Sequence, residues 1–209
     1  MYGKDAVLFS IKPEYVRKME SGEKKYEFRK AIFSGINPPI QTTYIKGTPT
    51  YQKDPKAAPI LIYLYESVPT KAITGYFYCE EVISNSPQKL WELFSEDAGI
   101  CQEDFFKYFK KARYNDVQYQ LGHALKISDY SKLSSSIPLS EINILRAPQN
   151  FQYLAHYQIA GMEPLNGKYG VWEDMGYMSS WADPIEAYKE CDRLHDIDGR
   201  HYFVKHNPV

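Results

Sequence analysis

Residues 21 to 30 read S-G-E-K-K-Y-E-F-R-K, and the rest of the chain is organised around this stretch. A short helical pattern precedes it. Gly22 predicts the end of that helix, because glycine readily takes the left-handed conformation that closes a last helical turn. A strand is expected to follow, with side chains alternating between two faces. On this reading Tyr26 and Phe28 face the core.

Charged side chains occupy the other face of the predicted strand. Glu27 and Arg29 lie two residues apart there, close enough to pair or to converge on a ligand. Lys25 shares their face, and Lys24 stands at the mouth of the turn, where a flexible ammonium reaches over the same surface. We expect a binding site here. The alternative is a Glu27–Arg29 pair that only fixes the strand.

Four residues match the pattern G-x-K-x-x-E-x-R, and through them the chain resembles the ASCH domain family: Gly22, Lys24, Glu27 and Arg29. Matching text precedes the pattern (V-L-F-S-I-K-P-E-Y) and recurs at 65–77 and 146–154. The resemblance covers roughly residues 5 to 154. It implies an α+β fold, a PUA-like mixed β-barrel with flanking helices.

The resemblance also implies a function, because PUA-like domains dock RNA or modified nucleobases. In this chain Lys24 and Arg29 would hold a phosphate or carbonyl, while Glu27 orients Arg29 or accepts protons from a base edge. The strand end at 65–67 is expected to join this site. The predicted ligand-binding residues are therefore Lys24, Lys25, Glu27, Arg29, Tyr65, Glu66 and Ser67.

Whether the chain is an enzyme stays open at this point. Some small ASCH proteins resemble amidohydrolases that deacylate acetylcytidine, with the motif lysine in catalysis and a threonine where this chain has Glu27. Lys24 fits the catalytic role that this resemblance implies, whereas Glu27 departs from the threonine of that pattern. If the chain is an enzyme, Lys24 and Glu27 are the candidate catalytic residues. RNA cleavage, known within the superfamily, is a further alternative. The sequence contains no dinucleotide-binding or P-loop pattern and no compact zinc motif, and we expect neither cofactor nor metal.

Composition describes a globular chain of 209 residues, with 44% hydrophobic residues and a net charge of −1. Its three cysteines form no C-x-x-C pair, which favours reduced thiols. No run approaches the ~18 apolar residues of a membrane span, and the N-terminus lacks an apolar signal stretch. We therefore predict a soluble cytoplasmic protein that does not associate with membranes; its oligomeric state is left open.

Short-range patterns predict strands at 6–11, 60–65, 71–83 and 116–127, and helices at 13–21, 86–99 and 102–112. Residues 34–58 contain four prolines and predict a long loop with a short strand at T-T-Y-I. Residues 131–140 predict a Ser-rich connection. Lysines near 107–111 fit either compensation of the helix dipole or a phosphate-facing patch.

Two domains are expected from these patterns. Residues 1–154 form the ASCH-like domain, with the proline-rich loop inserted in it. Residues 155–209 lie outside the resemblance and carry more acidic than basic residues. A hairpin turning near 174–176, a helix at 183–195 and a final strand predict a small α/β appendage with the order ββαβ.

Overall fold

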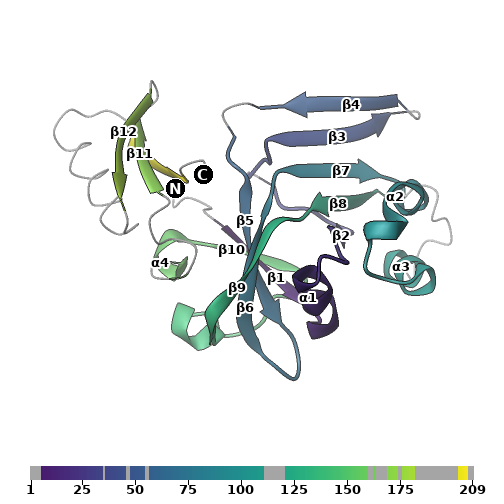
Figure 1. Cartoon of the computed structure of the whole chain (residues 1–209), viewed down its shortest axis with the longest axis horizontal. Helices are drawn as coiled ribbons and strands as arrows, with labels where there is room; N and C mark the ends of the chain where they lie inside the picture. Colours follow the sequence, from purple (N-terminus) through teal and green to yellow (C-terminus); the bar gives the residue numbers. More distant parts are fainter. Residues whose placement is uncertain are drawn as a thin grey trace. The chain divides into compact units, whose positions relative to one another are not determined.

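The computed structural model describes residues 6–34, 36–45, 48–54, 57–110, 121–159, 162, 169–173, 176–181 and 202–206 (Figure 1). The chain divides into two compact units, Met1–Leu154 and Ala155–Val209. The first unit carries the motif and the candidate site.

One five-stranded sheet of the first unit has the order β10-β1-β5-β6-β9. Its strands are β1 (Ala6–Ile11), β5 (Ile60–Glu66), β6 (Ala72–Cys79), β9 (Ser128–Ile137) and β10 (Phe151–Leu154). β1 runs parallel to β5 and antiparallel to β10. Both β1 and β5 are largely apolar and, apart from Ser10 and Glu66, buried, as central strands are.

A second five-stranded sheet has the order β2-β8-β7-β3-β4. Its strands are β2 (Tyr26–Arg29), β3 (Ile40–Ile45), β4 (Thr48–Lys53), β7 (Glu81–Asn85) and β8 (Gly122–Lys126). Neither sheet closes on itself within the described residues. The mixed α+β fold is therefore confirmed, whereas the predicted closed barrel is not.

Three sequence-based boundaries differ from the structure. The predicted loop at 34–58 contains the antiparallel hairpin β3–β4, which pairs with β7 through β3. The Ser-rich stretch at 131–140 lies largely in β9, an edge strand in which Leu133 is buried. The single strand expected at 71–83 is two strands, β6 and β7, that belong to different sheets.

Helices flank these sheets, as predicted. They are α1 (Pro13–Glu20), α2 (Pro87–Phe94), α3 (Gln102–Phe109), and the short 3-10 helices η1 (Ser95–Asp97) and η3 (Leu139–Ile142). The α2 helix begins as its sequence indicates, because Ser86 Oγ accepts a hydrogen bond from the backbone N–H of Lys89 and Pro87 follows the cap. α2 packs against β7, β8 and α3.

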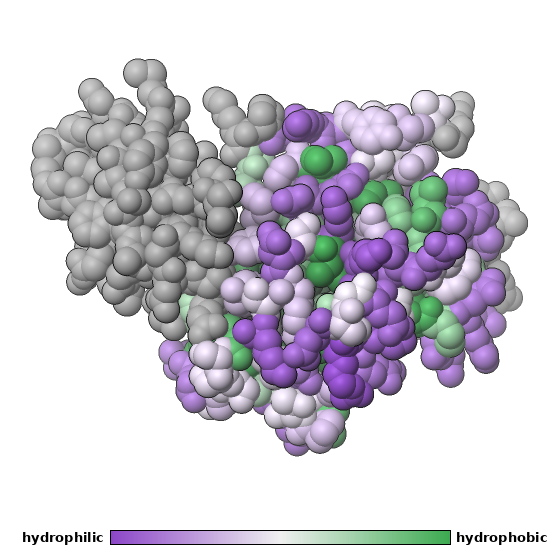
Figure 2. All heavy atoms as spheres, in the orientation of Figure 1, coloured by the Kyte–Doolittle hydropathy of each residue, from purple (hydrophilic) through white to green (hydrophobic). Residues whose placement is uncertain are grey.

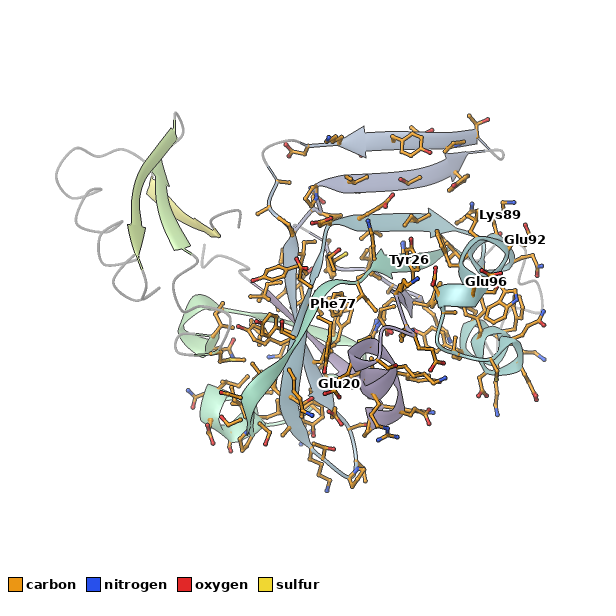
Figure 3. All side chains as sticks on the ribbon, in the orientation of Figure 1. Glu20, Tyr26, Phe77, Lys89, Glu92 and Glu96 are labelled. Carbon is orange, nitrogen blue, oxygen red and sulfur yellow. The ribbon has the colours of Figure 1, made fainter. Side chains whose placement is uncertain are left out.

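Two apolar clusters cover opposite faces of the second sheet. One joins β1, β5 and β6 of the first sheet to Val82 and Leu125 of the second, and includes Val16 and Met19 of α1. The other packs Phe28, Ile83 and Ala124 against α2 and α3. Figure 3 shows Phe77 among the strands and Lys89 and Glu92 on the outer side of α2. β2 therefore lies at the edge of a sheet that is packed on both faces.

The second unit contains a three-stranded antiparallel sheet of order β12-β11-β13. Its elements are α4 (His156–Ile159), β11 (Tyr169–Glu173), β12 (Gly176–Trp181) and β13 (Tyr202–His206). The helix predicted at 183–195 lies outside the described residues, so the ββαβ arrangement stays a prediction.

The surface in view is mostly polar where it is described, with hydrophobic residues in small groups (Figure 2). None of the described helices has the length and apolar character that a membrane-crossing helix needs.

Candidate functional site

The turn between α1 and β2 places the motif side chains. The backbone N–H of Gly22 donates to Met19 O at 3.0 Å, and that of Lys24 donates to Lys18 O at 2.9 Å. Gly22 has φ of +75°, the left-handed conformation that the sequence predicts for it. The chain then reverses directly into β2, which pairs antiparallel with β8.

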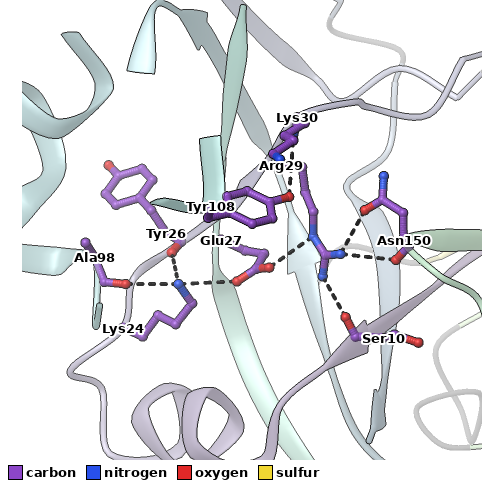
Figure 4. Close-up of polar contacts among 9 residues, drawn as sticks. All are labelled: Ser10, Lys24, Tyr26, Glu27, Arg29, Lys30, Ala98, Tyr108 and Asn150. Atoms are coloured by element: carbon purple, nitrogen blue, oxygen red, sulfur yellow. Dashed lines mark hydrogen bonds and ion pairs between the residues drawn. The ribbon is translucent and has the colours of Figure 1, made fainter. Parts of the chain in front are cut away.

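Lys24 is buried, with 4% of its surface exposed. Its Nζ donates to Tyr26 O at 2.7 Å and to Ala98 O at 2.9 Å, and lies 3.2 Å from Glu27 Oε2 (Figure 4). An ammonium has three N–H donors, so these three acceptors satisfy it completely. The rings of Tyr15 and Phe28 flank it at 5.5 and 5.3 Å from Nζ to their centroids.

Glu27 joins the two cations of the motif. Its Oε1 lies 3.0 Å from Arg29 Nε, and its Oε2 faces Lys24. The Arg29 N–H is not aligned on the oxygen as in a hydrogen bond, so this contact is an ion pair. The three charged side chains form one buried row, Lys24–Glu27–Arg29, which we call the motif triad.

Arg29 ties the motif to distant parts of the first unit. Its Nη1 donates to Asn150 O at 3.1 Å and to Asn150 Oδ1 at 3.0 Å, and its Nη2 donates to Ser10 O at 3.2 Å. Its guanidinium carbon lies 4.1 Å from the centroid of the Phe9 ring. Arg29 therefore links β2 to the end of β1 and to the segment before β10.

A cavity of about 370 Å³ lies over the motif triad, and we call it the motif cavity. All three triad residues line it, together with Phe28. The remaining lining residues come from the end of β1, the start of α1 and the region of α3: Ser10, Ile11, Lys12, Tyr15, Ile100, Asp104, Phe105, Lys107 and Tyr108. The motif cavity thus has a charged floor, aromatic walls and exposed charges at its rim.

Burial changes the proton affinity of several lining groups. Desolvation lowers the pKa of Lys24, and the neighbouring carboxylate of Glu27 opposes this effect. Desolvation raises the pKa of Tyr15 to about 12, aided by Glu14 and Asp104. It also raises the pKa of Tyr108. Burial thus favours the neutral phenol of both tyrosines, and the Tyr108 hydroxyl accepts a hydrogen bond from the backbone N–H of Lys30 at 3.4 Å.

Metal ligation finds no support in the described ranges, which contain no group of three or more His, Cys, Asp or Glu side chains that could hold an ion. Asp104 lines the cavity and accepts a hydrogen bond from Cys101 Sγ at 3.4 Å. Asp104 is exposed to solvent.

Two kinds of relative match this sequence. An ASCH domain-containing ribonuclease from Zymomonas mobilis is 25% identical over 107 residues, which are 51% of this chain and 57% of the ribonuclease. Large ribosomal subunit protein uL22 of Ureaplasma parvum is 26% identical over 104 residues, which are 50% of this chain and 31% of that protein. The chain thus spans less than two thirds of the length of each of these relatives. No family model matches it.

Solved structures decide the fold. The crystal structure of ASCH from Zymomonas mobilis matches with a TM-score of 0.55 at 20% identity, covering 75% of this chain and 92% of that chain. The chain has the ASCH fold. A mutant of the same Zymomonas protein gives a TM-score of 0.56, also at 20% identity, over 76% of this chain and 94% of that one. The resemblance predicted from the motif is confirmed.

The other predicted site residues of this ASCH fold do not line the motif cavity. Lys25 pairs at the surface with Asp97 at 2.7 Å. Tyr65 is buried, and Glu66 accepts hydrogen bonds from Thr70 and Thr74. The backbone N–H of Ser67 donates to Ile11 O at 2.9 Å, so this strand end supports a residue of the cavity wall. Their role in binding stays a prediction.

Several residues around the ASCH motif lacked a signal in the sequence. Asn150 and the carbonyl of Ala98 are far from the motif along the chain, and no local pattern marks either as a partner. Tyr108 belongs to a predicted helix whose three phenylalanines define the inward face, so the sequence pattern does not mark it as a site residue. Lys107 belongs to the lysine cluster for which a phosphate-facing patch was one of two interpretations, and the structure places it at the cavity rim.

Gly99 packs closely against Lys24, and a substitution tests this close packing. It has φ of +60°, and a Cβ added there would lie 2.7 Å from Lys24 Cβ and 3.3 Å from Lys24 Cα. We expect Gly99→Ala to lower the free energy of unfolding by about 2–4 kcal/mol, because a left-handed alanine and a steric overlap both destabilise. Urea denaturation measures the change.

Gly22→Ala is the matched control for that substitution. Gly22 also has a positive φ, +75°, but a Cβ added there meets nothing within 4 Å. Its loss should be about 1 kcal/mol, from the backbone conformation alone. Equal losses for the two variants would contradict the close packing of Gly99 on Lys24.

Proposed function

We propose that this chain binds RNA or a nucleotide-like ligand, with a base held in the motif cavity. The fold supports this proposal, because the matching ASCH relative is named a ribonuclease and another relative is a protein of the large ribosomal subunit. Both names concern RNA. For this chain, RNA binding is inferred from the geometry of its own motif cavity.

The composition of the motif cavity carries the proposal. Its volume of about 370 Å³ falls at the small end of the range of about 300–1,000 Å³ that ligand sites occupy. Tyr15, Phe28 and Tyr108 supply aromatic surface of the kind on which bases stack. Lys12 and Lys107 are exposed at its rim, where phosphates would lie outside the cavity.

Burial of Lys24 and Arg29 changes which residues we expect to contact phosphates. Sequence reasoning assigns phosphate or carbonyl binding to Lys24 and Arg29. In the structure Lys24 is fully satisfied by Tyr26 O, Ala98 O and Glu27, and Arg29 is held by Ser10 and Asn150. We therefore assign phosphate contacts to the rim lysines, while the motif triad shapes the floor.

An RNA-binding measurement with Lys107→Gln tests this assignment. We expect weaker binding of labelled single-stranded RNA by fluorescence anisotropy. We also expect the slope of log K against log salt concentration to fall by about 0.7, since one phosphate contact is lost. The control is Lys132→Gln, an exposed lysine that pairs with Glu20 and does not line the cavity. Identical affinities and slopes for the two variants would contradict a phosphate site at the rim.

Geometry weighs against Lys24 as the nucleophile or base of a deacylating enzyme. Such a lysine needs a free lone pair on Nζ within reach of the substrate. All three Nζ donors are instead engaged by two backbone carbonyls and Glu27, an arrangement that suits the protonated ammonium. Deacylation of an acylated cytidine thus ranks behind binding.

RNA cleavage is the second candidate function, and the ribonuclease name of the Zymomonas relative favours it. Incubating the purified chain with end-labelled single-stranded RNA separates the two possibilities. Cleavage products that accumulate with time would establish an enzyme. Retention of intact RNA would support a binding role alone.

A further inference from the structure

The motif cavity offers hydrogen-bonding groups of one kind at its floor. Lys24 has no donor left after Tyr26 O, Ala98 O and Glu27. Of the five N–H donors of Arg29, two are donated to Asn150 and one to Ser10 O. Nε makes only an ion pair with Glu27, but this nitrogen is buried and out of reach of a ligand. The two cations therefore have at most one N–H to offer a ligand.

Glu27 keeps unused capacity. An ionised carboxylate accepts about four hydrogen bonds, two on each oxygen. Among the described residues, Oε1 contacts Arg29 and Oε2 contacts Lys24, which leaves one position on each oxygen. The side chain is buried, with 10% of its surface exposed, yet it lines the cavity. Asp104 is also an acceptor there, but it lies at the rim, where water competes for it.

We infer that the motif cavity selects guanine, whose adjacent N1–H and N2–H₂ donors match the two free positions on the Glu27 carboxylate. This inference rests on the proposed function, because it names the base that the cavity takes. The aromatic side chains of Tyr15, Phe28 and Tyr108 provide flat surface for a planar ring.

The other bases present unsuitable edges to a carboxylate. On their Watson–Crick edges, neutral adenine and cytosine each place a ring nitrogen acceptor beside their single amine donor. Uracil places its one N–H between two carbonyl oxygens. Each of these acceptors would face a negatively charged oxygen in a buried site, where unpaired or repelling polar groups weaken binding strongly.

A ligand series on the unmodified protein tests the inference. The probes are short labelled uridine oligonucleotides with one variable central nucleotide: guanosine, inosine, N1-methylguanosine, adenosine, cytidine or uridine. Inosine lacks only the N2 amine, and N1-methylation removes only the N1 donor. Fluorescence anisotropy gives the dissociation constants.

We expect the guanosine probe to bind tightest. Inosine should bind about tenfold more weakly, because one hydrogen bond to a charged group is lost, and N1-methylguanosine about 100-fold more weakly, because the methyl group also blocks approach. Equal affinity for all six probes would overturn guanine selection and leave RNA binding intact. No binding of any probe would overturn the proposed function as well.

The variant Glu27→Gln tests the role of the Glu27 side chain directly. Glutamine keeps the shape of the side chain but replaces one acceptor oxygen with an amine donor. Where circular dichroism shows the variant folded, we expect its guanosine and inosine affinities to become equal within a factor of about two. A persisting tenfold preference in the folded variant would overturn the role of Glu27 in reading the base. The ligand series stands by itself if the variant does not fold.

Discussion

Glu27→Gln is expected to lower the free energy of unfolding by about 3–5 kcal/mol. Glu27 lies between Lys24 and Arg29, at 3.2 and 3.0 Å from their nitrogens, and all three side chains are buried. Neutralising the carboxylate leaves two buried cations without a counter-charge, and desolvation then opposes the folded state. Urea denaturation at neutral pH measures the change.

Glu92→Gln is the matched control, because it makes the same chemical change in an exposed ion pair. Glu92 lies 2.9 Å from Lys89, and both side chains are about half exposed, at 49% and 46%. Water screens an exposed pair, so this variant should lose far less stability than Glu27→Gln. A loss for Glu27→Gln as small as that for Glu92→Gln would contradict a buried triad.

Lys24→Met is expected to have an effect of similar size, about 3–5 kcal/mol. Methionine approximates the length of the lysine stem but donates no hydrogen bond. The carbonyl oxygens of Tyr26 and Ala98 would lose their donor, and Glu27 would keep only Arg29 as a counter-charge. Differential scanning calorimetry and urea denaturation both report this loss.

Lys25→Met gives a control one residue away. Lys25 is exposed, and its partner Asp97 is partly exposed, so their 2.7 Å contact is screened by water. We expect Lys25→Met to change the free energy of unfolding far less than Lys24→Met does. If the two adjacent lysines proved equally tolerant, the fixed position of the Lys24 ammonium would be wrong.

Local signals account for the parts of the fold that the sequence predicts. The apolar run of β1, the proline at the start of α1 and the glycine after it each act within a few residues. The short strand predicted at T-T-Y-I lies in β3, but β4 is not predicted, because Pro49 and the other prolines of 34–58 indicate a loop. Pro49 is tolerated because β4 is an edge strand that needs no continuous donor row. β9 was missed for a related reason, since an exposed edge strand needs few apolar residues.

The candidate site divides in the same way. Alternation along β2 predicts that Glu27 and Arg29 share a face, and the turn at Gly22 predicts that Lys24 approaches them. Burial of all three, and their contacts with Ala98, Ser10 and Asn150, depend on segments far apart in the chain. Such long-range partners follow from packing rather than from any local pattern.

The two bonds from Arg29 to Asn150 have a consequence for synthesis of the protein. The N-terminus of a chain emerges from the ribosome first, and a domain folds as a unit once its residues have emerged. Arg29 emerges early, but its acceptors on Asn150 follow 121 residues later. During translation the Arg29 guanidinium therefore cannot bind Asn150 until nearly the whole first unit has been synthesised. A chain that ends before Asn150 lacks the two hydrogen bonds from Arg29 to this residue. Its motif triad therefore cannot adopt the arrangement seen in the structure.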